Sequence, residues 1–173
     1  MINFSEYIRN IPDFPVKGIQ FKDITTLLKE GDVFAAAVDQ MYGPYKEEEI
    51  NKIVGIESRG FIFGAAMAYK LNAGFIPVRK PGKLPAETLS EEYQLEYGTD
   101  SLEVHLDGIE AGDRVLVIDD LLATGGTAQA TCTLVEKLGG QIVGLSFLIE
   151  LTSLKGREKL SKYRVHSLIQ YEI

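Results

Sequence analysis

Residues 115–127 read Val115-Leu116-Val117-Ile118-Asp119-Asp120-Leu121-Leu122-Ala123-Thr124-Gly125-Gly126-Thr127. The first four residues form an apolar run without alternation, as expected for a parallel strand that is buried on both faces. After the loop, apolar or small residues recur at helical spacing until Gly139-Gly140, where the helix should stop. The segment therefore predicts a strand–loop–helix unit.

The loop of this unit has the composition of a phosphate site. Residues 124–127 offer hydroxyls and unobstructed backbone N–H groups at a helix N-terminus, where the helix dipole also favours an anion. The adjacent carboxylates of Asp119 and Asp120 would repel a phosphate, so they suit hydroxyl groups or a metal-bound ligand. A ribose 5-phosphate satisfies both halves of the segment.

Two other phosphate-binding motifs are absent from the sequence. It contains neither the G-x-x-x-x-G-K-[ST] pattern of P-loop enzymes nor the G-x-G-x-x-G pattern of dinucleotide-binding folds. A plain strand–helix turn with two solvated aspartates is the remaining alternative. The length of the string, in which each residue type suits a role, favours a phosphoribosyl site.

Composition sets the class of protein. A chain of 173 residues suits a single domain, 1–173, with its own core. Its net charge of −7 disfavours nucleic-acid binding, and two histidines with one cysteine disfavour a zinc site. With no apolar run long enough for a membrane and no signal-like segment, we expect no membrane partner and a cytoplasmic location.

Strand and helix patterns alternate along the chain. This order predicts an α/β fold with a mostly parallel central sheet flanked by helices on both faces. Strands are expected at 53–56, 75–79, 115–118, 142–149 and 165–170. Helices are expected at 4–10, 33–45, 61–71, 128–138 and 155–162, with a loop over 12–23.

Residues 89–106 have a different pattern. Apolar and polar residues alternate on either side of 98–100, which predicts two half-exposed antiparallel strands and a turn. Ligands of parallel sheets bind at the carboxyl ends of the strands. The loops that follow the predicted parallel strands should therefore converge on one cleft.

One of these loops reads Glu57-Ser58-Arg59-Gly60-Phe61. Arg59 can meet a phosphate in fork geometry, and Gly60 permits close approach of the backbone. The alternative is an ordinary helix start with Ser58 as the N-cap. The position of the loop after a buried strand favours a ligand site.

A second loop reads Arg79-Lys80-Pro81-Gly82-Lys83-Leu84-Pro85. Three cations within five residues, beside two prolines, make a rigid basic loop. Such a loop can neutralise a pyrophosphate, both bound and as a leaving group. A solvated charged loop is the alternative.

These motifs resemble those of the type I phosphoribosyltransferases. The Asp-Asp string with Leu-Leu-Ala-Thr-Gly-Gly-Thr is similar to their motif for phosphoribosyl pyrophosphate (PRPP), and Glu-Ser-Arg-Gly-Phe and Lys-x-Gly-Lys-Leu-Pro are typical of the adenine branch. The resemblance runs from about Pro12 to the C-terminus. It implies the type I phosphoribosyltransferase fold, with an N-terminal hood (about 1–30) and an antiparallel flap (about 86–107).

The resemblance also implies a reaction and a set of roles. Adenine and PRPP would give AMP and pyrophosphate, in purine salvage. Asp119 and Asp120 would hold the ribose hydroxyls, and the loop residues Ala123, Thr124, Gly125, Gly126 and Thr127 the 5-phosphate. Pyrophosphate would lie on Ser58, Arg59, Arg79, Lys80 and Lys83, with Arg59 and Lys80 also catalytic. The Mg²⁺ cofactor would be bound mainly through PRPP, so no direct side-chain ligand is assigned.

For the base, the resemblance implies a stacking residue and a proton carrier. Phe21 would stack on the purine, for which plain core packing is the alternative. Gln20, Lys22 and Leu121 join the adenine site, although Lys22 stands where many relatives carry Arg. Glu96, in Glu96-Tyr97-Gly98, would be the acid/base residue. Spacing alone does not separate it from the other glutamates of this segment, Glu91, Glu92 and Glu103.

Two alternatives to adenine transfer remain. One is a phosphoribosyltransferase for xanthine or guanine, because the PRPP-binding half does not choose the base. The other is a non-catalytic PRPP-sensing regulator, which the acidic charge and the short segment before the core disfavour. The family resemblance also implies a homodimer.

Overall fold

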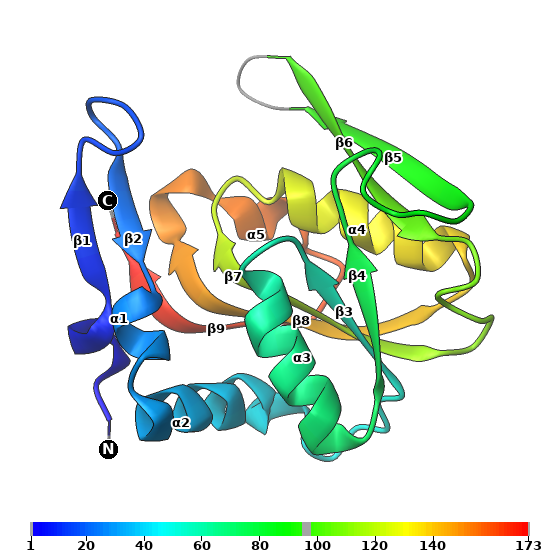
Figure 1. The fold of residues 1–173 in the computed structure, drawn as a ribbon, viewed down its shortest axis with the longest axis horizontal. Coiled ribbons are helices and arrows are strands. Elements are labelled where there is room, and N and C mark those ends of the chain that lie inside the picture. Colours follow the sequence, from blue (N-terminus) through cyan, green and yellow to red (C-terminus); the bar gives the residue numbers. More distant parts are fainter. Residues whose placement is uncertain (1, 95–97, 173) are drawn as a thin grey trace.

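A five-stranded parallel sheet organises the chain, in the order β4-β3-β7-β8-β9 (Figure 1). The computed structural model describes residues 2–94 and 98–172. The strands of the sheet, in that order, are Gly74–Val78, Lys52–Ile56, Arg114–Leu122, Gln141–Leu151 and Val165–Tyr171. The predicted mostly parallel sheet is confirmed.

Helices cover both faces of this sheet. On one face, α2 (Gly31–Tyr42) and α3 (Gly60–Leu71) pack around a core that includes Phe63, Met67 and Leu116. On the other face, α4 (Gly126–Lys137) packs around a second core. The sheet is therefore buried on both faces, as the continuous apolar run at 115–118 predicts for its central strand.

The central strand β7 is longer than predicted. It continues to Leu122 and pairs with β8 through Asp119, Leu121 and Leu122. The two carboxylates therefore lie on the strand rather than in the loop that follows it. Because successive strand residues point to opposite faces, the side chains of Asp119 and Asp120 leave β7 in different directions, yet both line one cavity at the carboxyl end of the strand.

The N-terminal segment departs from the prediction. A short 3-10 helix, η1 (Phe4–Tyr7), replaces the helix expected at 4–10, and the loop expected over 12–23 is largely a hairpin of β1 (Arg9–Pro12) and β2 (Gln20–Asp23). An Arg9–Asp23 ion pair of 2.6 Å ties the strands together. The hairpin is followed by α1 (Thr25–Leu28), which the sequence did not predict.

The flap is an antiparallel pair, as predicted. It consists of β5 (Thr88–Gln94) and β6 (Thr99–His105), so β6 begins already within the turn predicted at 98–100. Leu102 and Val104 of β6 are fully buried in the core beneath the flap. Alternation along this strand therefore separates a buried face from a partly exposed one.

The C-terminal region contains less helix than predicted. A 3-10 turn, η3 (Thr152–Leu154), leads into α5, which spans only Gly156–Lys159 instead of 155–162. A further 3-10 turn, η2 (Gly43–Tyr45), ends the α2 region. Among the described residues, no helix is long and apolar enough to cross a membrane.

Candidate active site

A cavity of about 550 Å³ opens at the carboxyl ends of β3 and β7. In Figure 1 the hood hairpin and the flap stand on opposite sides of the β7–α4 loop that borders it. Most of the residues predicted for the site line this cavity: Phe21, Ser58, Arg59, Lys80, Asp119, Asp120, Leu121, Ala123, Thr124, Gly125, Gly126 and Thr127. Glu57, Leu102, Leu122 and Ala128 also line it and were not predicted.

The phosphate loop, defined here as residues 123–127, ends in the first turn of α4. Gly125 has φ +79, a left-handed conformation that favours glycine, and it is the residue before the helix. No described side chain caps this helix start with a hydrogen bond. The first backbone N–H groups of α4 therefore face the cavity as donors, which suits an anion.

The paired carboxylates occupy the cavity floor. Asp120 is 5% exposed, and its backbone N–H donates to Asp119 Oδ1 at 2.8 Å. Burial raises the pKa of both carboxyls, and the neighbouring charge of Asp120 raises the pKa of Asp119 further. Hydroxyl donors or a cation bound here would favour the ionised form and lower these pKa values again.

Arg59 lies where the carboxylates meet the hood. Its Nε is 2.8 Å from Asp120 Oδ2, and its guanidinium carbon lies 5.1 Å from the centroid of the Phe21 ring. The helix N-cap is Arg59 itself, without a side-chain cap hydrogen bond, so Ser58 is not the ordinary N-cap considered above. A ligand bound beside Arg59 would therefore contact both the positive guanidinium group and the aromatic ring of Phe21.

Glu57 organises the basic loop and is the main residue that the sequence analysis missed. Its buried carboxylate accepts from Arg79 Nε at 2.8 Å and from the Lys80 backbone N–H at 2.9 Å, and it pairs with Lys83 Nζ at 3.2 Å. Burial would raise its pKa, but these hydrogen bonds and the Lys83 charge hold the pKa below its usual value. Arg79 and Lys83 are thus turned toward Glu57 and do not line the cavity.

Lys80 reaches the flap. Its Nζ donates to Tyr93 Oη at 2.6 Å and to the Asp100 carboxylate. Partial burial would lower its pKa, but these two contacts raise the pKa above its ordinary value, so the side chain stays charged. The cation predicted to meet pyrophosphate therefore has a flap carboxylate as its partner in this conformation.

The hood places one of its three predicted residues in the cavity. The Phe21 ring lines it and packs edge-on against Phe14, with 5.1 Å between ring centroids. Gln20 accepts from Asn10 Nδ2 at 2.7 Å, and Lys22 donates to Asn10 Oδ1 at 3.1 Å. The side chains of Gln20 and Lys22 therefore hold the hairpin together and do not line the cavity.

The predicted acid/base residue Glu96 lies outside the described residues, so its placement stays a prediction. Two of the other flap glutamates have partners away from the cavity. Glu91 pairs with Lys137 at 2.5 Å, and Glu103 accepts from the Gly82 N–H at 3.2 Å. Neither of these, nor Glu92, is among the residues that line the cavity.

A family model described as "Phosphoribosyl transferase domain" matches residues 20–173, which defines the class of protein. An adenine phosphoribosyltransferase from Chloroflexus aurantiacus is 58% identical over 169 residues, 98% of each chain. The crystal structure of adenine phosphoribosyltransferase from Rhodothermus marinus matches with a TM-score of 0.94 at 56% identity, over 97% of this chain and 96% of that chain. The chain belongs to the adenine phosphoribosyltransferase family within that class.

A more distant member of the family has been solved with ligands. The Saccharomyces cerevisiae adenine phosphoribosyltransferase, complexed with an imino-altritol 1,6-bisphosphate and adenine, is 40% identical and has a TM-score of 0.90. The alignment covers 95% of this chain and 96% of that chain. The fold that forms the cavity is therefore shared over nearly the whole length of both proteins.

Proposed function

We propose that this chain transfers the 5-phosphoribosyl group of PRPP to adenine, giving AMP and pyrophosphate. The observation that carries the proposal is one cavity that is lined by the open N-terminus of α4, by Asp119 and Asp120, and by Phe21. A phosphate donor set, a hydroxyl acceptor pair and an aromatic face are the three requirements of a purine ribonucleotide. The family supports the same choice of substrates, since a relative of this chain was solved with adenine.

In this proposal, the phosphoribosyl half of PRPP lies on the β7–α4 unit. The 5-phosphate accepts from backbone N–H groups of the phosphate loop, and the ring hydroxyls donate to Asp119 and Asp120. During transfer, a purine nitrogen forms a bond to the anomeric carbon as the bond to pyrophosphate oxygen breaks. Positive charge develops on the sugar ring as in glycoside hydrolysis, and the two carboxylates stabilise it.

The pyrophosphate half of PRPP is assigned to the two loops that follow β3 and β4. Ser58 and Arg59 follow β3, and Lys80 lines the same cavity, so these residues are placed to hold the leaving group. Arg79 and Lys83 would join them only by exchanging their contacts with Glu57 for contacts with phosphate oxygens. This basic surface offsets the negative charge that accumulates on pyrophosphate as the bond breaks.

Mg²⁺ completes the proposed substrate complex. Mg²⁺ keeps several waters and is usually bound by one or two carboxylates together with substrate phosphates. Asp119 and Asp120 fit this donor set, although Asp120 Oδ2 is paired with Arg59 Nε at 2.8 Å and would have to exchange that contact to bind the ion directly. The ion would neutralise phosphate charge, with PRPP itself supplying most of its ligands.

Binding of the adenine base is assigned to the hood, Leu121 and the flap. Phe21 would stack on adenine, and backbone groups near Gln20 and Lys22 would read the ring edge. Glu96 stays the predicted acid/base residue that manages the proton on the purine. The flap would exclude water from the reactive sugar, which otherwise hydrolyses.

The reaction is tested by incubating the protein with PRPP, Mg²⁺ and each purine or pyrimidine base. We expect nucleotide formation with adenine and none with guanine or xanthine. Turnover with guanine or xanthine but not adenine would overturn the specificity. Tight PRPP binding without turnover of any base would instead indicate a regulator.

We further propose that the protein is a cytoplasmic homodimer. The observation that supports a dimer is an apolar stripe along the outer face of α3, in which Ile62 is 38% exposed and Tyr69 is 91% exposed, with Ala65 and Ala66 between them. Such a stripe on a helix favours a partner surface. Sedimentation should give the mass of two chains, and Tyr69→Asp should shift the protein toward one chain.

A further inference from the structure

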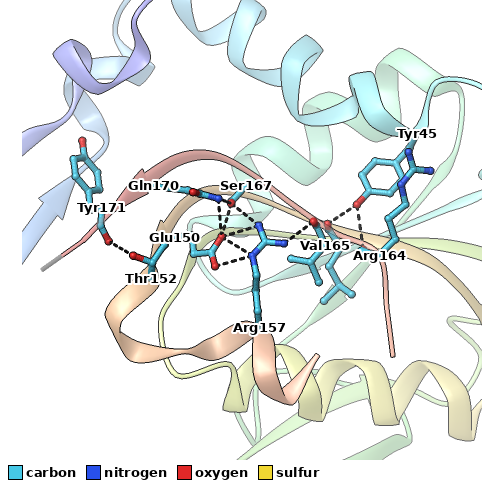
Figure 2. Close-up of polar contacts among 10 residues, drawn as sticks. Tyr45, Glu150, Thr152, Arg157, Arg164, Val165, Ser167, Gln170 and Tyr171 are labelled. Atoms are coloured by element: carbon cyan, nitrogen blue, oxygen red, sulfur yellow. Dashed lines mark hydrogen bonds and ion pairs between the residues drawn. The ribbon is translucent and has the colours of Figure 1, made fainter. Parts of the chain in front are cut away.

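An ion pair between a buried carboxylate and a partly exposed arginine lies next to the phosphate loop but outside the cavity. Glu150, near the end of β8, has a side chain that is only 5% exposed, and Arg157 of α5 binds it through two nitrogens (Figure 2). Arg157 Nε lies 2.8 and 2.9 Å from the two carboxylate oxygens, and Nη2 lies 2.8 Å from Oε2. Burial would raise the pKa of Glu150, but the hydrogen bonds from Arg157 and Ser167 hold this pKa below its usual value.

The other donors of Arg157 go to the neighbouring strand β9. Nη1 donates to the Val165 carbonyl oxygen at 2.8 Å, and Nη2 donates to Ser167 Oγ at 2.9 Å. One guanidinium therefore joins α5 to both β8 and β9, a task that uses the planar fork of arginine. Because α5 has only four residues, its own hydrogen bonds cannot fix it, and its place depends on such contacts.

The residue before Arg157 contacts the phosphate loop. Gly156 is buried, and a Cβ added to it would lie 2.3 Å from the Ala123 carbonyl oxygen and 3.0 Å from the Gly125 nitrogen. Conversely, a Cβ added to Gly125 would lie 2.5 Å from the Gly156 carbonyl oxygen. The two backbones are therefore in direct contact, so a shift of α5 would move the loop.

We propose that Arg157, held by Glu150, is a positioning residue for the phosphate loop. It fixes α5 on the sheet, and Gly156 then fixes the loop whose N–H groups meet the 5-phosphate. This inference rests on the proposed function, which places a phosphate there. A small displacement of a ligand-binding group weakens binding strongly. The effect should be confined to the phosphoribosyl half, because Phe21 of the adenine side belongs to the hood.

Arg157→Lys is the first test, because lysine keeps the charge but cannot form the fork. We expect the Kd for ribose 5-phosphate, measured by calorimetry, to rise about tenfold, and the KM for PRPP to rise by a similar factor. The KM for adenine should change by less than about twofold. Ser167→Ala removes one of the contacts and should give a smaller change in the same direction.

Arg164→Lys is the matched control. Arg164 lies just before β9 at the other end of the group of residues in Figure 2, where its Nη2 donates to the Pro44 carbonyl oxygen at 2.5 Å and its guanidinium carbon lies 4.9 Å from the Tyr45 ring centroid. This variant should lower the melting temperature without changing the Kd for ribose 5-phosphate. If Arg157→Lys behaves in the same way, the Glu150–Arg157 pair only stabilises the fold and the inference is overturned.

The outcomes separate this inference from the proposed reaction. If the wild type binds ribose 5-phosphate but turns over no base, and Arg157→Lys weakens that binding, the positioning role stands and the reaction fails. If the wild type does not bind ribose 5-phosphate, both are overturned. If Arg157→Lys does not fold, Ser167→Ala decides in its place, and an unchanged Kd overturns the inference.

Discussion

The proposed phosphate side and the proposed base side of the cavity are built in different ways. On the phosphate side, the donors are backbone groups of a loop fixed by Gly125 at φ +79 and by its contact with Gly156. On the base side, hood and flap contribute side chains that contact other side chains, as Phe21 does with Phe14 and Lys80 with Tyr93. We infer that the loop proposed to bind the 5-phosphate is preformed. The residues proposed to bind the base and pyrophosphate, such as Phe21 and Lys80, would instead exchange their side-chain partners when ligands bind.

The largest effect should come from disrupting the preformed side. Gly125→Ala places a Cβ 2.5 Å from the Gly156 carbonyl oxygen, so the loop must move. We expect kcat/KM for PRPP, from initial rates, to fall about 100-fold. Gly112→Ala is the control, because Gly112 has φ +90 but no atom within 4 Å of the added Cβ. Equal losses in both variants would assign the effect to backbone strain instead.

The next effect should separate the two sides. Phe21→Ala removes the aromatic face and should raise the KM for adenine about tenfold, since stacking on a base contributes about 1–3 kcal/mol. The KM for PRPP should stay nearly constant, because the loop is untouched. Phe21→Tyr keeps the ring and should retain most of the affinity for adenine. A parallel rise of both KM values in Phe21→Ala would mean that the hood supports the whole cavity.

A smaller effect should follow from releasing Lys80. Asp100→Asn weakens the contact that competes with pyrophosphate, and a partly exposed pair of this kind contributes about 0.2–1 kcal/mol. The KM for PRPP should therefore fall by up to about fivefold. Glu91→Gln, which breaks the flap's other ion pair with Lys137, should leave this KM unchanged. An increased KM in Asp100→Asn would show that the contact helps binding.

The smallest effect concerns pH. Burial raises the pKa of Asp119 and Asp120, so these two carboxyls bind protons more readily in the folded protein than in the unfolded chain. The contribution of these two groups to the free energy of unfolding should therefore decrease as pH rises above the ordinary carboxyl pKa of 3.8, whereas carboxyls with a lowered pKa, such as Glu57 and Glu150, contribute in the opposite direction. Urea denaturation at several pH values should show that Asp119→Asn loses this contribution, so its free energy of unfolding should fall less, or rise more, with pH than that of the wild type. An identical slope would mean that Asp119 does not titrate in this range.

The sequence predicted the strand–loop–helix structure of the β7–α4 segment and its place at the cavity almost completely, because this information is local. An apolar run, two carboxylates and a glycine loop are consecutive, and each type of residue has a short-range structural reason to be there. Only the strand end was misplaced: Asp119 and Asp120 lie within β7, since pairing with β8 continues past them. No local pattern reports how far a neighbouring strand extends.

The base side was predicted less well, because its contacts join distant segments. Glu57 was missed as the partner of Arg79 and Lys83, although a carboxylate that follows a buried strand beside a basic loop was a usable signal. The pairing of Lys80 with Asp100 depends on the packing of the flap over the cavity. The hairpin of the hood was predicted as a loop because its strands have only four residues each and the first of them ends in a proline.

The crystal structure of the complex with AMP would test the central claim most directly. The account predicts the phosphate of AMP on the backbone N–H groups of Gly126 and Thr127, the ribose hydroxyls on Asp119 and Asp120, and the adenine ring against Phe21. The positions of Gly125 and Gly156 should be the same with and without the nucleotide. Phosphate bound away from this loop, or a loop that rearranges on binding, would contradict the account.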